Sequence, residues 1–513
     1  MIATVFVVIA IVRIVATYRE FNATFDEPAH LATGMEWLDR GQYTIESLHP
    51  PLARVAVALG PYLDGVRSQG HTALWREAYF VMYSSDSYYR TLTLMRLGVL
   101  PFFILLCVAV WLWGRQLFGD EAATVAVALT TLLPPVLAHA SVATTDMALT
   151  STLMLTLFLL TRWLDAPTRA LSVALGVAGA LAVLSKFSSG PYLIVAGPAI
   201  IAVRWWMSSR DGARRFMLPP VSRILVALGT SLFVIWAGYR FSVATIGGLP
   251  LPAPEFVKGL YKVAERNGLG LETYLLGELS THGWWYFFPV TLAVKTPIAF
   301  LMLGGAGVVF AAREARRARD WRVLVPLIVV LAILGSSMAA NINIGVRHVL
   351  PIYPLLAIVA GGAAVALWRS AGRVREARAF VVVAAAWLLV ASVRSHPHYI
   401  AYFNEVAGSR PDRILVNGDL DWGQDLDRLA DTVRARGITS IRIAYFGSAS
   451  PPKHIPGVQR LAPYDRSPGW VAVSEAVIKG VLVAPADGFR WADSVATVAK
   501  VGKSIRLYHF EQE

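Results

Sequence analysis

The stretch "LTLMRLGVLPFFILLCVAVWLWG" occupies residues 92–114, and residues 97–114 within it carry no charged side chain. A helix needs about 17–25 mainly apolar residues to cross roughly 30 Å of hydrocarbon, so this run is long enough to span a membrane. The whole chain shares this character: 56% of its 513 residues are hydrophobic, 16% are charged, and the mean hydropathy is +0.53. Soluble cores of this size cannot hide that much apolar surface. The sequence therefore predicts a polytopic α-helical membrane protein.

Similar apolar runs before and after this stretch bring the predicted total to about eleven transmembrane helices. The predicted spans are 1–18, 92–114, 121–138, 144–163, 170–185, 190–207, 222–240, 286–311, 323–340, 347–368 and 379–395. The first span has no small-residue cleavage site and contains Arg13, so we expect it to remain as an uncleaved anchor.

Basic residues set the predicted orientation. The formal net charge is +13, and the arginines cluster in short loops between apolar runs, which is typical of cytoplasmic loops and argues against nucleic acid as a partner. With residue 1 inside, the arginine-bearing loops near 115, 165, 212, 318 and 373 all fall on the cytoplasmic side, and the C-terminus falls outside. The main clusters are Arg210, Arg214 and Arg215; Arg313, Arg316, Arg317, Arg319 and Arg322; and Arg369, Arg373, Arg375 and Arg378.

The composition divides the chain into two predicted parts. Residues 1–395 form the transmembrane domain, with long outer loops at 19–91 and 241–285, in the first of which the apolar periodicity of 29–38 suggests an amphipathic helix along the interface. Residues 396–513 form a small extracytoplasmic α/β domain. Within it we predict a helix in "DWGQDLDRLADTVRARG" and strands in "RILVNG", "SIRIAYFG", "WVAVS" and "SIRLYHFE". The single cysteine, Cys107, excludes a disulfide within the chain.

Two adjacent carboxylates, Asp26 and Glu27, follow the first span within about ten residues, between Phe25 and Pro28. Burial there would raise a carboxyl pKa toward that of a working general base, and proline would fix the direction of the pair. The alternative is that the pair only solvates a loop. The rigid corner at His49-Pro50-Pro51-Leu52 is equally explained as the entry to a helix over 51–63.

Further charged groups enter the membrane from the same predicted side. Asp146 begins a span, where a helix cap is the alternative to a functional role. Lys186, Arg347 and His348 lie at outer helix ends, and Lys295 lies within an apolar run. Snorkelling to the interface is the alternative for Lys186 and Arg347, whereas charges at such depth are otherwise functional.

Acids and cations that meet at an outer rim suit one reaction class. The cations would bind the phosphate of a lipid-linked phosphosugar and stabilise it as it leaves. A carboxylate would accept the proton of an attacking acceptor hydroxyl. We therefore predict a glycosyltransferase that needs no nucleotide pocket.

Several motifs carry a resemblance to a known family. "FDEPAH" (25–30) followed by "HPPLA" (49–53) resembles the first outer loop of protein O-mannosyltransferases and of their bacterial relatives, which include the lipid A aminoarabinose transferases. These are GT-C membrane glycosyltransferases, similar to glycosyltransferase family 39. Other segments that are similar to bacterial members are "TTDMAL" (144–149), "LSKFSS" (184–189), "VKTP" (294–297), "RHVLPIYPLL" (347–356) and "HPHYIAYFNEVAG" (396–408) leading to "DLDWGQDL" (419–426).

The resemblance implies a GT-C-like fold, a polyprenyl-phosphate-linked sugar donor and inversion at the anomeric carbon. It implies Asp26 as catalytic base, Glu27 as the group that orients acceptor or base, and Asp146 as a second essential acid. It also implies that Lys186 and Arg347 contact the donor phosphate, a role we extend to Lys295 and His348. Eukaryotic protein mannosyltransferases carry a β-trefoil domain that this chain has no room for, which leaves the acceptor open among protein, lipid and glycan.

No cofactor is required by this chemistry, and a divalent cation is left open. His49, His282 and His348 could contribute ligands, but their spacing matches no metal motif, and we assign His49 and His282 to the loops that meet the acceptor. The acids at 419, 421, 425 and 427 fail the EF-hand pattern. The alternative function is a transporter or a non-catalytic lipid- or glycan-binding protein on the same scaffold, but transporters place charges near the midplane and show inverted repeats. We expect the protein in the bacterial plasma membrane, with the site facing outward.

Overall fold

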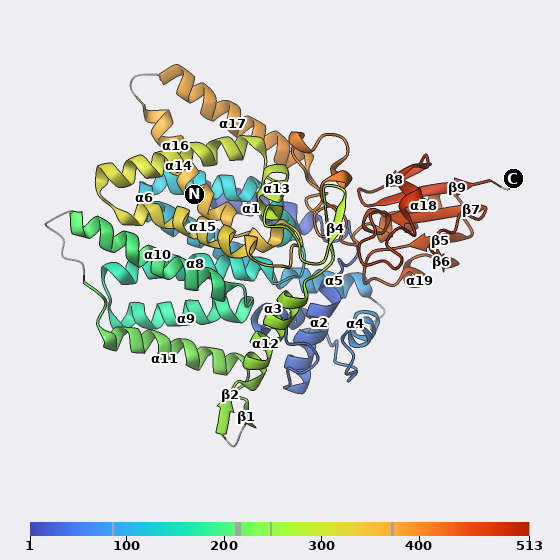
Figure 1. Ribbon diagram of the computed structural model, residues 1–513, viewed down its shortest axis with the longest axis horizontal. Helices are drawn as coiled ribbons and strands as arrows, with labels where there is room; N and C mark the ends of the chain where they lie inside the picture. The colour runs from blue at the N-terminus through green and yellow to red at the C-terminus, as the bar shows by residue number, and fades with distance from the viewer. Residues whose placement is uncertain (85–86, 211–216, 247–248, 371–373, 512–513) are drawn as a thin grey trace.

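The computed structural model of the chain describes residues 1–84, 87–210, 217–246, 249–370 and 374–511. Long helices lie side by side and a β-sheet lies beyond one end of them (Figure 1). The long helices are α1 (Ile2–Ala16), α6 (Leu100–Leu132), α8 (Asp146–Asp165), α9 (Arg169–Ser185), α10 (Ser189–Arg210), α11 (Val221–Gly238), α14 (Ile298–Ala318), α15 (Val325–Met338), α16 (Ile352–Arg369) and α17 (Val374–Arg394). Within the described residues, 8 helices are long and apolar enough to cross a membrane. The prediction of a polytopic helical membrane protein is confirmed.

The longest helix, α6, is two helices joined at Gly119. Its φ of 85° and ψ of 177° interrupt the helix and lie in a region that favours glycine. The two halves fold back on each other closely enough that a Cβ on Gly114 would lie 3.1 Å from the Cα of Ala123. Counting both halves, a helix occupies each of the eleven predicted spans.

One predicted span is divided. The run 286–311 contains α13 (Phe287–Lys295) and α14, which are separated at Thr296-Pro297. Proline lacks an amide proton and cannot continue the preceding helix. Lys295 therefore lies at a helix end rather than in the middle of a span.

Small residues let the long helices approach closely. A Cβ on Gly361 of α16 would lie 2.6 Å from the carbonyl oxygen of Ala122 in α6. Gly307 of α14 packs equally tightly against Ala360 of α16. In membranes, where burial of apolar surface gives little drive, such close van der Waals packing holds helices together.

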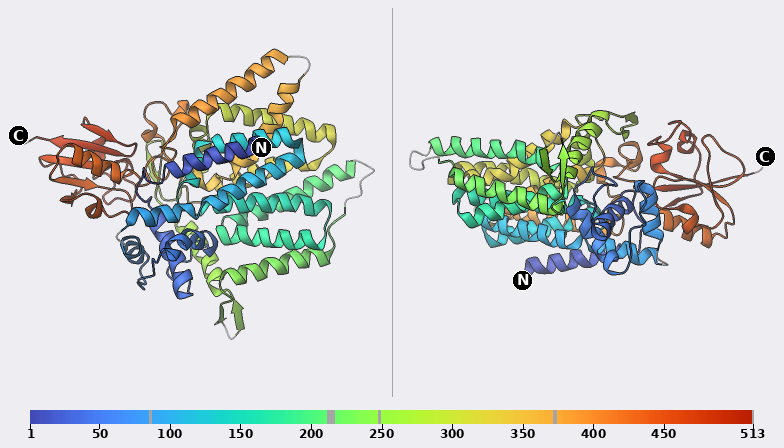
Figure 2. Two further views of the ribbon diagram at one scale, coloured as in Figure 1. Left: turned by 180° about the vertical axis from the view of Figure 1, so that it is seen from behind. Right: turned by 90° about the horizontal axis from the view of Figure 1, so that it is seen from below.

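The segment between α1 and α6 is a compact helical unit at the end of the bundle nearest the sheet (Figures 1 and 2). It consists of α2 (Glu27–Met35), the π-turn η1 (Glu36–Arg40), α3 (Pro51–Leu63), α4 (Leu74–Tyr83) and α5 (Tyr88–Leu97). All residues of α2 are buried, because α3 and α4 pack around it. A helix does form here as predicted, but its predicted position along the membrane interface is wrong, because a helix buried by protein on all sides has no face for lipid. The helix-entry interpretation of His49-Pro50-Pro51 is confirmed, because α3 begins at Pro51.

The remaining elements of the bundle region are short. They are α7 (Pro134–Ala140), β1 (Val243–Ile246), β2 (Leu249–Pro252), α12 (Pro254–Leu269), β3 (Thr273–Leu275), β4 (Glu278–Ser280), η2 (Trp321–Leu324) and η3 (Val346–Val349).

The C-terminal sheet has the strand order β6-β5-β7-β9-β8, in which β6, β5 and β7 are parallel and β9 is antiparallel to both neighbours. The helices and strands of the chain after α17 are η4 (Glu405–Ala407), η5 (Pro411–Arg413), α18 (Leu426–Ala435), β5 (Ile441–Ala444), α19 (Pro451–His454), β6 (Val458–Arg460), β7 (Gly469–Ser474), α20 (Glu475–Ile478), η6 (Arg490–Asp493), β8 (Ala499–Val501) and β9 (Ile505–Phe510). Three predicted strands are confirmed as β5, β7 and β9. The domain boundary at 395/396 stays a prediction.

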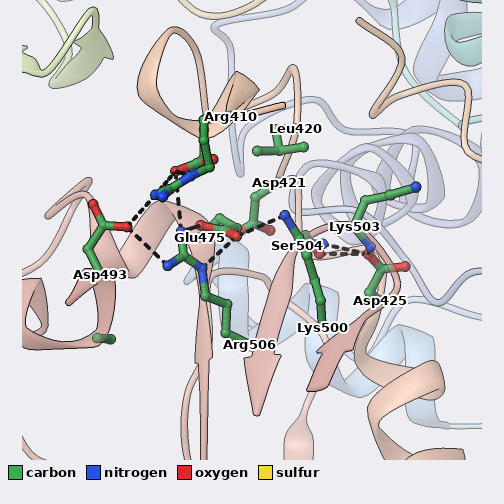
Figure 3. Close-up of polar contacts among 12 residues, drawn as sticks. Arg410, Leu420, Asp421, Asp425, Glu475, Asp493, Lys500, Lys503, Ser504 and Arg506 are labelled. Carbon is green, nitrogen blue, oxygen red and sulfur yellow. Dashed lines mark hydrogen bonds and ion pairs between the residues drawn. The ribbon is translucent and has the colours of Figure 1, made fainter. Parts of the chain in front are cut away.

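The strand predicted in "RILVNG" is wrong. The carbonyl of Val416 accepts hydrogen bonds from the amides of Asp419, Leu420 and Asp421, which closes a tight turn that a strand cannot make. The predicted helix of 421–437 begins only at Leu426. Asp421 and Asp425 use their side chains to accept backbone amides of other segments, including Ala476 and Ser504 (Figure 3).

Candidate functional site

Asp26 and Arg347 form the first half of the site. Asp26 precedes α2 as its N-cap, and Arg347 comes from η3, between α15 and α16. Arg347 Nη1 donates a hydrogen bond to Asp26 Oδ2 at 2.5 Å, and the guanidinium lies 4.3 Å from the ring centre of Trp422. The Asp26 side chain is 30% exposed, so one end of this buried pair still reaches solvent.

Asp146 and Lys186 form the second half. Lys186 Nζ, at the end of α9, donates to Asp146 Oδ1 at 2.7 Å. Asp146 also accepts a hydrogen bond from the Thr144 hydroxyl at 3.1 Å. Thr145, not Asp146, is the N-cap of α8; Asp146 lies in the first turn, where the alternative role of a partner for the helix dipole remains, and its carboxylate also binds Lys186. Snorkelling is wrong for Lys186 and Arg347, since both are buried and point at acids.

We call Asp26, Asp146, Lys186 and Arg347 the outer quartet. Both carboxylates lie within electrostatic reach of Arg347, which joins the two ion pairs into one cluster. The four residues come from four separate segments that meet at the end of the bundle near the sheet (Figure 1). The sequence predicted that acids and cations converge here, and the geometry brings these four together; their chemical roles stay predictions.

Glu27 does not face the quartet. Its carboxylate accepts from Arg96 Nε and Nη2, both at 2.9 Å, and from the amides of Thr24 and Ala143 at 2.7 and 2.8 Å. Burial alone would raise the pKa of Glu27, but Arg96 and these hydrogen bonds outweigh it and hold the pKa below its ordinary value. The expected rise in pKa is therefore wrong for Glu27. Its carboxylate ties the start of α2 to α5 and to the loop before α8, so it fixes the backbone that carries Asp26.

The Lys295 ammonium also has hydrogen-bond partners within the protein. Its Nζ donates to the carbonyls of Ile400 and Asp419 at 2.7 and 2.6 Å, and it lies 4.2 Å from the ring centre of Phe403. Asp419 Oδ1 in turn accepts the amide of Val346 at 3.0 Å, beside Arg347. Lys295 thus binds the segment whose Asp419 side chain holds the amide next to Arg347, and its contact with a donor phosphate stays a prediction.

The predicted histidines divide into two groups. His49 and His348 lie within electrostatic reach of Lys186 and Asp146. Burial and the Arg54 charge lower the pKa of His49 well below its ordinary value, so this imidazole is neutral at pH 7. His282 is exposed and bonds to Thr281, outside the cluster.

Four further residues at the site were not singled out from the sequence. Arg96 forms the ion pair with Glu27. Its charge within a predicted span was the feature of the sequence that could have singled it out. His30 belongs to the "FDEPAH" segment and packs edge-on against His49, with ring centres 5.4 Å apart. The Trp422 ring packs against the Arg347 guanidinium. The ring centres of His139 and Trp422 are 5.9 Å apart. The Nδ1 atom of His139 is buried and has no hydrogen-bond partner in the described part of the chain.

A divalent cation at the site stays a prediction. Within the described ranges no three histidine, cysteine, aspartate or glutamate side chains are grouped to hold one. Asp26 and Asp146 of the quartet are paired with Arg347 and Lys186, respectively. No step through a metal is derived.

Comparison with known proteins agrees with this fold. Residues 90–237 match the family model described as dolichyl-phosphate-mannose-protein mannosyltransferase, and this range includes the "TTDMAL" and "LSKFSS" segments. A search of curated proteins gave no significant match.

Among solved structures, the chain is similar to ArnT from Cupriavidus metallidurans bound to undecaprenyl phosphate, with 14% identity, a TM-score of 0.50, and coverage of 98% of this chain and 97% of that one. The archaeal oligosaccharyltransferase AglB from Archaeoglobus fulgidus, in complex with an inhibitory peptide and a dolichol-phosphate, gives 13% identity and a TM-score of 0.47 over 96% of this chain and 72% of that chain. The predicted resemblance and the GT-C-like membrane fold are confirmed.

Proposed function

We propose that the protein is a membrane glycosyltransferase that moves a sugar from a polyprenyl-phosphate-linked donor to an acceptor hydroxyl, with inversion. The observation that carries this proposal is the outer quartet, in which two carboxylates and two cations meet at the end of a membrane-spanning bundle. The family match over 90–237 and the likeness to an ArnT structure that holds undecaprenyl phosphate support it.

Arg347 and Lys186 would bind the donor phosphate. Arg347 uses Nη1 for Asp26 and Nε for a long contact of 3.4 Å to the carbonyl of Ile344, and its Nη2 has no hydrogen-bond partner among the described residues. That nitrogen is free to donate to a phosphate oxygen while Asp26 stays bound. Lys186, a single compact charge, would add a second contact from the Asp146 side.

Asp26 would act as the general base. The acceptor oxygen attacks the anomeric carbon, the bond from that carbon to the phosphate oxygen breaks, and the electron pair leaves with the polyprenyl phosphate. Asp26 Oδ takes the proton of the acceptor hydroxyl, and the cations stabilise the charge that develops on the leaving phosphate. Asp146 holds Lys186 in place for this step.

We also propose the orientation in the plasma membrane of a bacterium, with the N-terminus cytoplasmic and the sheet outside. The α8–α9 and α14–α15 turns lie at the end of the bundle away from the sheet (Figure 1), where Arg322 pairs with Asp165 at 3.0 Å. Arginine-bearing turns at that end fit a cytoplasmic location. Arg214, Arg215 and Arg373, which belong to the predicted basic clusters, lie outside the described residues.

Asp26→Asn tests the proposal. The assay is release of polyprenyl phosphate by purified protein in lipid nanodiscs, supplied with lipid-linked sugars and membrane extract from the source cell. Loss of a positioned general base lowers the rate by about 10²–10⁴-fold. The matched control is Asp64→Asn, which removes another arginine-paired acid of the same outer segment, the partner of Arg90, far from the quartet. Full activity of Asp26→Asn would end the assignment.

A further inference from the structure

One flank of helix α12 exposes apolar side chains. Val257, Leu260, Tyr261 and Ala264 follow at intervals of three and four residues, which places them on the same side of the helix. All four are exposed, and Tyr261 is 69% exposed. A contiguous apolar surface of this kind is typical of a site that a protein or a membrane covers. Nothing derived so far uses this helix.

The other exposed flank of α12 is basic. Lys258, Lys262 and Arg266 follow one another at intervals of four residues, which places them in one row along the helix. None of the three has an ion pair among the described residues, and one acid, Glu265, lies beside them. Two of the four lysines before residue 440 are in this row. Because cations normally concentrate in cytoplasmic loops, a basic row at the proposed outer end of the bundle calls for an anionic partner there.

The third side of α12 is fixed to the protein. The Phe256 ring contacts Phe187 and Tyr239, with ring centres 5.6 and 6.0 Å apart. A Cβ on Gly259 would lie 2.6 Å from the carbonyl oxygen of Ser47, so the helix packs closely against the loop before α3. Tyr239 is the C-cap of α11. The start of α12 therefore lies at the level where α11 ends, and its two exposed flanks are left for a partner.

An apolar surface leads from a membrane span to this region. α11 is one of the helices long and apolar enough to cross a membrane, and its Leu232 and Phe233 are exposed, as expected of side chains that face lipid. Phe233 contacts Phe241, the 49% exposed residue before β1 and β2, with ring centres 5.7 Å apart. The β1–β2 pair projects sideways from the bundle at the end of α11 (Figures 1 and 2). The lipid-facing surface of α11 is thus continuous with the elements that precede α12.

We propose that α12 lies in the headgroup layer of the bilayer and binds anionic phospholipid headgroups through Lys258, Lys262 and Arg266. Helices with a basic flank and an apolar flank lie in the plane of the interface and are attracted to anionic lipids. The apolar flank enters the boundary of the acyl chains, and the basic flank meets the phosphates. This surface is separate from the outer quartet and does not depend on sugar transfer.

A bilayer matches the order of the two flanks better than other partners do. It offers phosphate groups directly beside hydrocarbon, as the two flanks require. A soluble polyanion would bind the basic flank and leave the apolar flank in water. A second copy of the chain would bring an identical basic row, and like charges repel.

Lipid binding at α12 can be measured without catalysis. The protein is full-length, in nanodiscs of phosphatidylcholine and phosphatidylglycerol, and carries Ala264→Cys labelled with a nitrobenzoxadiazole fluorophore. Cys107 is buried, so the parent protein treated with the same label gives the background. Either lipid is supplied with brominated acyl chains, which quench a fluorophore that they touch. The ratio of the two quenching efficiencies gives the relative binding constant of the two lipids next to residue 264.

We expect both brominated lipids to quench, and phosphatidylglycerol to be preferred about fivefold or more, because one cation near an anionic surface strengthens binding by about that factor. The combined variant Lys258→Gln, Lys262→Gln and Arg266→Gln should lose the preference and keep the quenching, since its apolar flank is intact. None of the three side chains is buried, so the variant is expected to fold. High salt should also reduce the preference in the parent, because it screens the charges.

The matched control removes the same charge from the other end of the bundle. It combines Arg313→Gln, Arg316→Gln and Arg317→Gln in the last turns of α14, where all three side chains are exposed. We expect the preference at residue 264 to equal that of the parent, because these cations are distant from α12.

Three results would overturn the proposal. The first is a preference for phosphatidylglycerol that is equal in the parent and in the α12 variant. The second is a fluorophore at residue 264 that neither brominated lipid quenches, which would place α12 away from the bilayer. The third is an equal loss of preference in the α14 control, which would make it an effect of net charge rather than of this helix.

Discussion

The outer quartet and a second cluster of ion pairs in the described part of the chain differ in how completely their charges are used. In the outer quartet, Arg347 has one short bond to Asp26 and one nitrogen without a described partner. The second cluster, which we call the sheet-base network, consists of Asp412, Glu475, Asp493, Arg410, Lys479 and Arg506. Figure 3 labels four of them, Arg410, Glu475, Asp493 and Arg506. There Arg506 uses all three nitrogens, on Glu475, Asp493 and Asp412.

The comparison teaches that a buried ion pair does not by itself mark a functional site. Taking charges out of water is costly, and a network repays this only when every donor and acceptor is satisfied. Within the sheet-base network the buried Arg506 meets that condition, because all three of its side-chain nitrogens bind carboxylates, and it therefore stabilises the fold. The outer quartet leaves donor capacity unused beside a partly exposed carboxylate, which is the arrangement a ligand would complete.

The largest expected effect is on the sheet-base network. Arg506→Leu leaves Glu475 buried without its main partner and lowers the free energy of unfolding by about 3–5 kcal/mol. Thermal unfolding followed by tryptophan fluorescence measures this. The control is Arg434→Leu, which removes an exposed pair with Asp431 and changes the midpoint little. An unchanged midpoint for Arg506→Leu would show that this network is no more structural than the quartet.

Arg347→Leu tests whether the outer quartet is a functional site rather than a structural ion-pair cluster. It removes the proposed phosphate donor, so the donor KM rises or kcat falls by about 10²-fold in total. The unfolding midpoint changes less than for Arg506→Leu, because Asp26 is 30% exposed and water can solvate it. A midpoint that falls as far as that of Arg506→Leu, with unchanged donor kinetics, would make Arg347 a structural residue.

Lys186→Ala tests whether Lys186 binds the donor rather than the acceptor. The ammonium is a single charge on one side of the proposed phosphate, so we expect the donor KM to rise about tenfold and the acceptor KM to change less. Steady-state kinetics with each substrate varied in turn separates the two. An unchanged donor KM would remove Lys186 from the phosphate site.

The smallest expected effect is the change with pH of the contribution that Glu27 makes to stability. Because the pKa of Glu27 is below its ordinary value of 4.5 in the folded protein, its stabilising contribution is complete above that value and is lost as the pH falls through the folded pKa. Glu27→Gln should therefore be less stable than the parent at pH 7, and the difference should narrow on acidification. Unfolding midpoints across pH 3–7 measure this, and a constant difference would contradict it.

The helices were predictable because apolar length is a local property that the membrane demands. The site was partly predictable for the same reason: Asp26, Asp146, Lys186 and Arg347 are charges at helix ends, where a charge needs a reason. The prediction failed where long-range partners decide. The residues near Glu27 in the sequence do not predict its ion pair with Arg96. Those near Lys295 do not predict its hydrogen bonds to the carbonyls of Ile400 and Asp419. "RILVNG" likewise has strand composition, but its turn is set by packing against distant segments.

The position of Trp422 beneath Arg347 has a consequence for biogenesis. A ribosome delivers the chain from its N-terminus, so Asp26, Asp146 and Lys186 are inserted long before the tryptophan emerges. The quartet stays without this ring until synthesis has passed residue 422. A chain that ends before residue 422 therefore lacks the ring against which the Arg347 guanidinium packs.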